Sequence, residues 1–367
     1  MLKPPAADAT SRAALIALPL LAIAASYAPA GAYDAAPAAV TWERDISEIV
    51  ERRCASCHAP GGFASIPLTT YDEARPYAEA MRKLTASGEM PPWGAAPGVG
   101  DFANDRRLSA EEIDLMAAWA EGGALESITT AEAPPLEPEA EHAADERGPE
   151  DRLTGGTLVP LAPARVDRAM QRTASATLQL PAGLVLTAWT VEPGTPAIVE
   201  RVDLEIGSRW LGTWAPGETG IAFPPDTGVP LAASTLLTAR IAYRSPAEGA
   251  VDFTRLRIWM AREERPKSVR ELTVVRSWRA VNPVDLIAIR PAREGDRVEV
   301  VARLPRNRVE RLGLLTAPSR VPHPTYQLAR PLPLAAGAVI ETTAPVRLLY
   351  AAPPAPPPPT GTRRRSS

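Results

Sequence analysis

The sequence is poor in the residues that most metal and disulfide sites require. Its 367 residues include two cysteines and three histidines. This supply excludes a disulfide-rich scaffold and a multi-histidine metal cage. Neither sign of charge is in marked excess, because 40 Lys and Arg face 43 Asp and Glu for a formal net charge of −3. A nucleic-acid binder that relies on bulk positive charge is therefore disfavoured.

Long hydrophobic runs are also missing. The apolar run at 13–25 falls short of the ~20 residues that a membrane-spanning helix needs. It follows a weakly basic start and precedes two small-x-small triplets within 28–32. We therefore predict a secretory signal peptide over 1–32, a periplasmic or otherwise exported protein, and no membrane span after cleavage.

Proline is abundant, at 41 residues, and disfavours long helical bundles. Helical periodicity is confined to 40–126, with helices expected at about 44–53, at about 71–84 and after a capping box that begins at Ser109. From about 164 onward, short β-like runs such as 187–191 lie between Pro and Gly turns, which is typical of antiparallel sandwiches.

These patterns predict a multidomain chain, with a small all-α domain followed by an all-β region of two antiparallel sandwiches. The expected parts are the α domain at 40–126, an acidic Pro-rich linker at 127–163, a first β-sandwich at 164–265, a second and truncated β-sandwich at 266–350, and a disordered Pro/Arg tail at 351–367.

Both cysteines fall in the string Cys54-Ala55-Ser56-Cys57-His58. This C-x-x-C-H pattern is the attachment signature of c-type haem. A redox dithiol and a zinc site remain as alternatives, although the strand context of the first and the further ligands of the second are missing from the sequence. We predict one covalent haem c held by Cys54 and Cys57, with His58 as an axial ligand of the iron.

A second axial ligand is expected further along the chain. Met90 lies 32 residues after His58, between Glu89 and two prolines that suit a stiff loop holding a sulfur atom. Met81 and Met116 are the competitors, but both occupy apolar helical positions where a core role is expected. We therefore predict Met90 as the distal ligand.

A haem iron with both axial positions filled passes electrons rather than binding oxygen. We therefore expect an electron carrier and not an enzyme, with no catalytic residue. Trp93 and Trp119 are expected to pack against the haem rather than to relay electrons.

The segment 42–123 resembles a bacterial cytochrome c module. The strings that carry this resemblance, besides the C-x-x-C-H motif, are Pro67–Ala74, Met90–Trp93 and Phe102–Ile113. That module is often fused to a region similar to copper type II ascorbate-dependent monooxygenases of the peptidylglycine-hydroxylating kind. The later part of the chain resembles this partner in outline, through stretches such as 193–196, 214–217 and 223–228.

The resemblance implies histidine ligands for copper, and this sequence departs from it there. Where the family has a His-His pair, this chain has Glu200-Arg201, and where it has His-Tyr, this chain has Ala242-Tyr243. The stretch that corresponds to the family's His-x-His, at about 315–319, contains no histidine. Besides His58, the remaining histidines are His142 and His323. Copper sites of this kind need imidazole, so we expect no copper and interpret the sandwiches as ligand-stripped relatives used for docking or assembly.

Three functions follow for comparison. The first is an exported electron-transfer protein that docks to a redox partner, which the sequence does not identify. The second is a structural or electron-wire subunit of a larger envelope redox complex. The third, disfavoured by the histidine count, is a copper monooxygenase fed by the haem.

Charge is unevenly distributed along the chain. Residues 40–128 carry 8 basic and 15 acidic side chains, whereas 152–350 carry 26 basic and 18 acidic ones. One interpretation is that these are solvated faces that contribute little, because exposed ion pairs are worth only about 0–1 kcal/mol. The alternative hypothesis is that the basic part docks on the acidic part, or on an acidic partner, in a salt-sensitive way.

Overall fold

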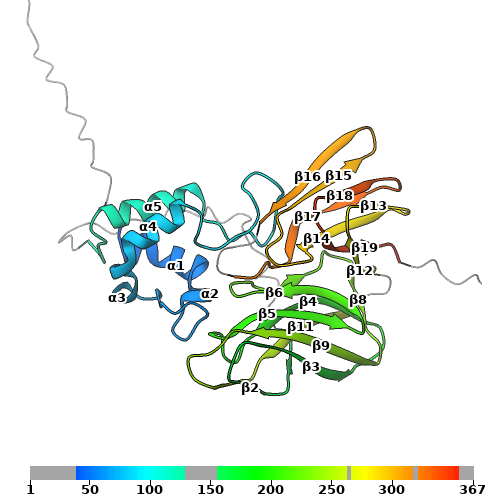
Figure 1. Ribbon diagram of the computed structural model, residues 1–367, viewed down its shortest axis with the longest axis horizontal. Helices are drawn as coiled ribbons and strands as arrows, with labels where there is room; N and C mark the ends of the chain where they lie inside the picture. Colours follow the sequence, from blue (N-terminus) through cyan, green and yellow to red (C-terminus); the bar gives the residue numbers. More distant parts are fainter. Residues whose placement is uncertain (1–38, 129–154, 263–265, 317–320, 355–367) are drawn as a thin grey trace, which may run out of the picture. The chain divides into compact units, whose positions relative to one another are not determined.

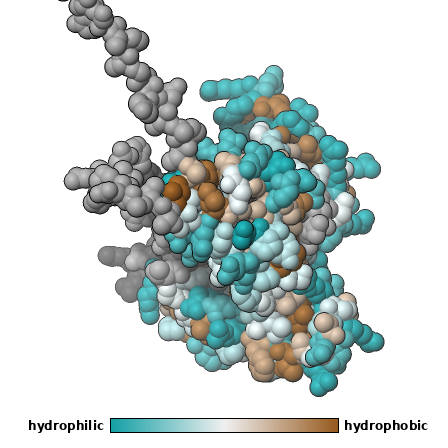
Figure 2. All heavy atoms as spheres, turned by 90° about the vertical axis from the view of Figure 1, so that its left-hand side faces the viewer, coloured by the Kyte–Doolittle hydropathy of each residue, from teal (hydrophilic) through white to brown (hydrophobic). Residues whose placement is uncertain are grey.

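The computed structural model describes residues 39–128, 155–262, 266–316 and 321–354 (Figure 1). The predicted signal peptide, His142 in the predicted linker and most of the predicted tail lie outside the described residues. No helix within these ranges is both long enough and apolar enough to cross a membrane. The face shown in Figure 2 is mostly hydrophilic, with hydrophobic residues in small separate groups.

The first described segment is helical. Its elements are η1 (Trp42–Ile46), α1 (Ser47–Arg53), α2 (Ala55–His58), α3 (Tyr71–Ala74), η2 (Arg75–Tyr77), α4 (Ala78–Ala86) and α5 (Ala110–Glu121). The predicted capping box is confirmed, because the Ser109 side chain accepts from the Glu112 amide while the Glu112 carboxylate accepts from the Ser109 amide. Trp119 is fully buried in the core of this segment and packs against Trp42, with ring centroids 5.8 Å apart.

The rest of the described chain is built of strands. They are β1 (Thr157–Pro160), β2 (Ala164–Val166), β3 (Met170–Gln179), β4 (Leu184–Glu192), β5 (Val199–Ile206), β6 (Arg209–Trp214), β7 (Ile221–Ala222), β8 (Thr227–Pro230), β9 (Ser234–Tyr243), β10 (Ala250–Asp252), β11 (Arg255–Arg262), β12 (Lys267–Val274), β13 (Ser277–Arg279), β14 (Val284–Pro291), β15 (Val298–Leu304), β16 (Arg308–Leu315), β17 (Tyr326–Leu334), β18 (Val339–Thr342) and β19 (Val346–Ala352). Buried and less buried positions alternate along β9, as expected for a strand with one face on a core.

The strands form a sheet-rich, β-sandwich-like fold. One nine-stranded sheet has the order β1-β11-β4-β8-β12-β19-β14-β17, with β7 paired to β4. Two four-stranded sheets, β3-β9-β5-β6 and β13-β18-β15-β16, and the β10-β2 pair complete the set. Side chains of the first four-stranded sheet and of β4 and β11 share one core, which includes Leu204, Leu237, Trp189 and Leu256.

The predicted fold class is wrong. The described residues from Ala39 onward belong to one compact unit dominated by strands, and no distinct small all-α cytochrome c domain is present among them. The helices are short, since the longest, α5, has 12 residues. The two expected sandwiches are not separate either, because the nine-stranded sheet continues through the parallel pair of β8 and β12.

The helical segment does not form a separate domain because its loop at 93–102 packs into the sheets. Ala95 forms a β-bridge with Leu315 of β16, and Phe102 forms one with Leu328 of β17. Ala95, Phe102 and the neighbouring Trp93 are buried in the core formed by the strands from β12 onward. The apolar side chains of 93–102 therefore complete a β core rather than an α domain.

Two predicted boundaries also change. The predicted linker at 127–163 contains β1, which pairs with β11 in the nine-stranded sheet. The predicted tail at 351–367 begins with Ala351 and Ala352, which are buried residues of β19.

A buried polar junction holds the loop in place. Asn104 is 8% exposed, and its Nδ2 donates to Glu218 Oε2 at 2.8 Å and to the Thr325 carbonyl at 2.9 Å. Its Oδ1 accepts from the Gln327 amide at 3.0 Å. The Gln327 side chain continues the network, because its Nε2 donates to the Gly220 carbonyl and its Oε1 accepts from the Ala222 amide. One side chain therefore connects the helical segment to both parts of the sheet region.

We predict that Asn104→Ala destabilises the whole described unit. The change removes three hydrogen bonds and leaves buried partners unpaired, so the free energy of unfolding should fall by about 3 kcal/mol. Denaturant titration measures the loss, and Gln179→Ala, at an exposed position of β3, is the matched control. Equal stability of the two variants would show that the junction does not contribute to folding.

Candidate functional site

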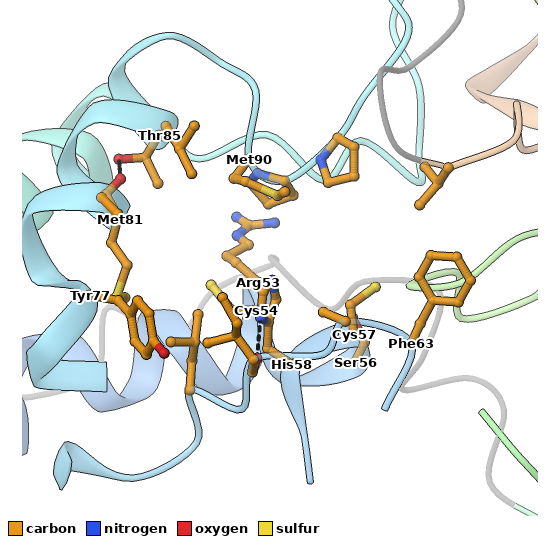
Figure 3. Close-up of a pocket in the computed structure, with 18 of the residues that line it drawn as sticks. Arg53, Cys54, Ser56, Cys57, His58, Phe63, Tyr77, Met81, Thr85 and Met90 are labelled. Atoms are coloured by element: carbon orange, nitrogen blue, oxygen red, sulfur yellow. Dashed lines mark hydrogen bonds between the residues drawn. The ribbon is translucent and has the colours of Figure 1, made fainter. Parts of the chain in front are cut away.

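A cavity of about 440 Å³ lies over the C-x-x-C-H motif (Figure 3). Its volume falls in the range of roughly 300–1,000 Å³ that is usual for ligand and cofactor sites. Cys54, Cys57, His58 and Met90 all line it. In Figure 3, Met90 lies across the open space from Cys54 and His58. The structure therefore brings the four predicted attachment and axial residues to one cavity.

The helical spacing explains how the motif reaches the cavity. Cys54 lies between α1 and α2 and caps both helices, and the His58 amide donates to the Cys54 carbonyl at 2.9 Å. Residues three and four positions apart on a helix share one face. Cys57 and His58 are therefore presented on the same side as Cys54, toward the cavity.

The histidine ring has a defined orientation. His58 Nδ1 lies 2.7 Å from the Ile66 carbonyl oxygen. A carbonyl can only accept, so Nδ1 donates its proton, and in the neutral tautomer of the ring Nε2 carries the lone pair. Hydrogen bonding of one ring nitrogen to a carbonyl is the arrangement that prepares the other nitrogen to bind a metal.

Partial burial affects the ionisation of both thiols. Burial raises the pKa of Cys54 to about 12, and burial also raises the pKa of Cys57. Both groups are therefore thiols at neutral pH, whereas a reactive redox dithiol has a lowered pKa. Within the described ranges, no three His, Cys, Asp or Glu side chains form a cluster that could hold a metal ion, so a zinc site finds no further ligands there.

Three methionine sulfurs compete for the distal position. Met90 follows α4, and its amide donates to the Leu84 carbonyl at 3.1 Å. Met81 and Met116 are buried in the core of the helical segment, where they were expected, but both also line the cavity. The assignment of Met90 as the distal ligand stays a prediction that mutagenesis must test.

Both tryptophans predicted to pack on a haem lie elsewhere. Trp93 contacts Phe102 and Tyr326, with ring centroids 6.2 and 4.9 Å away, in the core of the later strands. Trp119 is fully buried, and its indole nitrogen donates to the Leu125 carbonyl at 3.0 Å. Neither is among the described residues that line the cavity, because each ring fills a protein core instead.

Some cavity residues were missed by the sequence analysis. Arg53 and Arg106 come from the helical segment, whereas Arg244 follows β9 and Val321 precedes β17. The Arg244 guanidinium lies 4.1 Å above the Phe63 ring and donates to the Phe63 carbonyl. No local motif marks these residues, because they reach the cavity only through long-range contacts.

The positions that lack copper ligands make structural contacts instead. Arg201 of β5 forms ion pairs with Asp203 at 3.2 Å and with Glu294 at 3.3 Å. The Tyr243 hydroxyl donates to Asp252 Oδ2 at 2.9 Å inside the core. These side chains stabilise the sheets through polar contacts.

His323, the other described histidine outside the motif, is fully buried. Its Nδ1 lies 2.9 Å from the Tyr326 hydroxyl, and burial lowers its pKa to about 4. The ring is therefore neutral at physiological pH and belongs to the core beside Trp93.

No family model matches this chain, and no curated protein matches it. Among solved structures, the chain is similar to the major capsid protein P2 of bacteriophage PM2, with 10% sequence identity and a TM-score of 0.26. That match covers 54% of this chain and 98% of the capsid protein. A likeness this weak carries no argument about fold or function, so any functional conclusion depends on the cavity itself.

Proposed function

We propose that this protein binds one haem c covalently and transfers electrons. The observation that carries the proposal is that the Cys54, Cys57 and His58 side chains of the C-x-x-C-H motif and the more distant Met90 line one cavity of about 440 Å³. The free Nε2 of His58 fits an iron ligand, and the apolar lining from Leu68, Met81 and other residues fits a porphyrin ring.

The residues would divide the work in a simple way. Cys54 and Cys57 would hold the haem through thioether bonds, and the His58 imidazole and the Met90 thioether would bind its iron. A bound haem c supplies reversible one-electron transfer. With both His58 and Met90 bound to the iron, no position would be left for oxygen, which would favour electron transfer over oxygen chemistry.

We propose that the electrons pass to and from separate redox proteins after export of the chain. In this proposal the sheets provide no copper ligands, because the sequence has too few histidines for two copper centres. Their proposed use is docking or assembly with such a partner.

The proposal predicts iron without copper. Protein matured in a host with haem c assembly should contain about one iron per chain. Copper titration of the same protein should reveal no stoichiometric tight site, because Arg201 and Ala242 occupy positions where the monooxygenase family has histidines. Elemental analysis and copper titration measure both quantities. A tight copper centre that depends on His323 would support the monooxygenase alternative instead.

A further inference from the structure

We propose that the buried ion pair of Arg106 and Glu218 positions the Met90 loop, so that the sheet region controls how firmly Met90 binds the haem iron. This inference depends on the proposed function, because it assigns Arg106 and Glu218 as positioning residues for that site. Arg106 belongs to the helical segment, and Glu218 lies between β6 and β7.

The Arg106 guanidinium connects two backbone segments that flank the cavity. Its Nη2 donates to the Pro92 carbonyl at 2.8 Å, and its Nη1 donates to the Pro216 carbonyl at 2.7 Å. Pro92 is two residues after Met90 in the same loop. Because Pro91 and Pro92 have no amide hydrogen, carbonyls such as that of Pro92 are the backbone groups by which this part of the loop can be held.

Glu218 holds the guanidinium in that position. Its side chain is 4% exposed, and its Oε1 lies 3.4 Å from Arg106 Nε. Its Oε2 accepts from Asn104, so the carboxylate is fixed as well. A buried arginine and a buried carboxylate compensate each other's charge, and loss of either one leaves an uncompensated charge in the interior.

The same contact reaches the attachment side of the cavity. Gly217, next to Glu218, has φ +89°, and a Cβ built there would lie 3.3 Å from Cys57 Sγ. The loop of 215–218 is thus packed against Cys57 while it binds Arg106 through Pro216. Arg106 therefore sets the position of the Met90 loop relative to the sulfur that would hold the haem.

A methionine thioether is a weak neutral ligand, so its occupancy of the iron depends on how well the chain positions it. Without the Arg106 contact, the Met90 loop gains conformational freedom, and ligation by Met90 must restrict that freedom again. The expected consequence is easier displacement of Met90 by an external ligand.

The test uses the full-length oxidised haem protein and free imidazole as the competing ligand. We expect Arg106→Met to raise the apparent affinity for imidazole about tenfold and to weaken the long-wavelength charge-transfer band of Met-ligated haem. Arg106→Lys keeps the charge but cannot donate to both carbonyls in the same geometry, so it should give an intermediate increase. Glu218→Gln keeps the shape and the Asn104 contact, and should raise the affinity about threefold.

The matched control is Arg257→Met, which breaks the ion pair of Arg257 with Glu192 between β11 and β4. It should leave the imidazole affinity and the band unchanged. If Arg106→Met does not fold, Arg106→Lys and Glu218→Gln carry the test alone. Wild-type affinity in all Arg106 and Glu218 variants, with the band intact, would overturn this inference while leaving the proposed function in place. Absence of covalent haem from the wild type would overturn the proposed function.

Discussion

Replacement of both Cys54 and Cys57 by serine is expected to abolish covalent haem attachment completely. The wild-type chain, matured in a host that assembles haem c, should give a haem-staining band that survives denaturing electrophoresis. The double variant should give none, because serine hydroxyls cannot form the thioether bonds that the C-x-x-C-H motif provides. The loss is all or none, which makes this the largest effect that we predict.

The controls for this experiment address folding and the alternative sites. Serine is close in size to cysteine, and both cysteines are only half-buried. The replacements should therefore leave the sheets intact. Circular dichroism of the variant checks that they do. Extraction of haem from the wild type by acidified acetone would contradict the covalent assignment.

Replacement of Met90 by alanine is expected to abolish the long-wavelength charge-transfer band of the oxidised protein. Met90 lies across the cavity from His58, so its loss leaves the position opposite the histidine without its sulfur ligand (Figure 3). Methionine ligation raises the reduction potential of a haem. The reduction potential of the variant should therefore be lower than that of the wild type by on the order of 0.1 V, within the ~0.8 V range that axial ligands span. Absorption spectra and redox titration measure both changes.

Met81→Ala and Met116→Ala are the matched controls, since both sulfurs also line the cavity. Each should retain the band. Each should also lower the free energy of unfolding by about 2–5 kcal/mol, because both side chains are buried in the helical core. Retention of the band in Met90→Ala together with its loss in one of these variants would move the distal ligand to that residue.

Local signals in the sequence predicted local structure well. The capping box at Ser109 correctly placed the start of α5, since the pattern depends on side-chain contacts within one turn. The β-like run at 187–191 correctly indicated β4. The C-x-x-C-H spacing identified a segment that the structure indeed places at a cavity.

Contacts between distant residues were not visible in the same way. Phe102 and Trp93 were interpreted as part of an α domain, whereas they fill a β core against Tyr326. Their apolar character was evident, but nothing in a linear pattern says which core an apolar side chain joins. Asn104 likewise carries no local signal, because its partners are more than 100 residues away.

Bulk charge also gave an incomplete picture. The acidic helical segment and the basic strand region suggested a docking of opposite charges. The buried ion pair between them has the reverse polarity, with the cation Arg106 from the acidic segment and the anion Glu218 from the basic one. Specific buried contacts rather than net charge therefore define this junction.

The makeup of the cavity wall has a consequence for the order of maturation. The attachment motif is made early in synthesis, whereas Arg244 and Val321, which complete the wall, are made much later. If a cofactor is attached at the motif, as we propose, attachment could therefore precede synthesis of the residues that complete the wall. In that case the contacts of Arg244 and Val321 would form around a group that is already in place, and cofactor attachment would precede completion of the cavity.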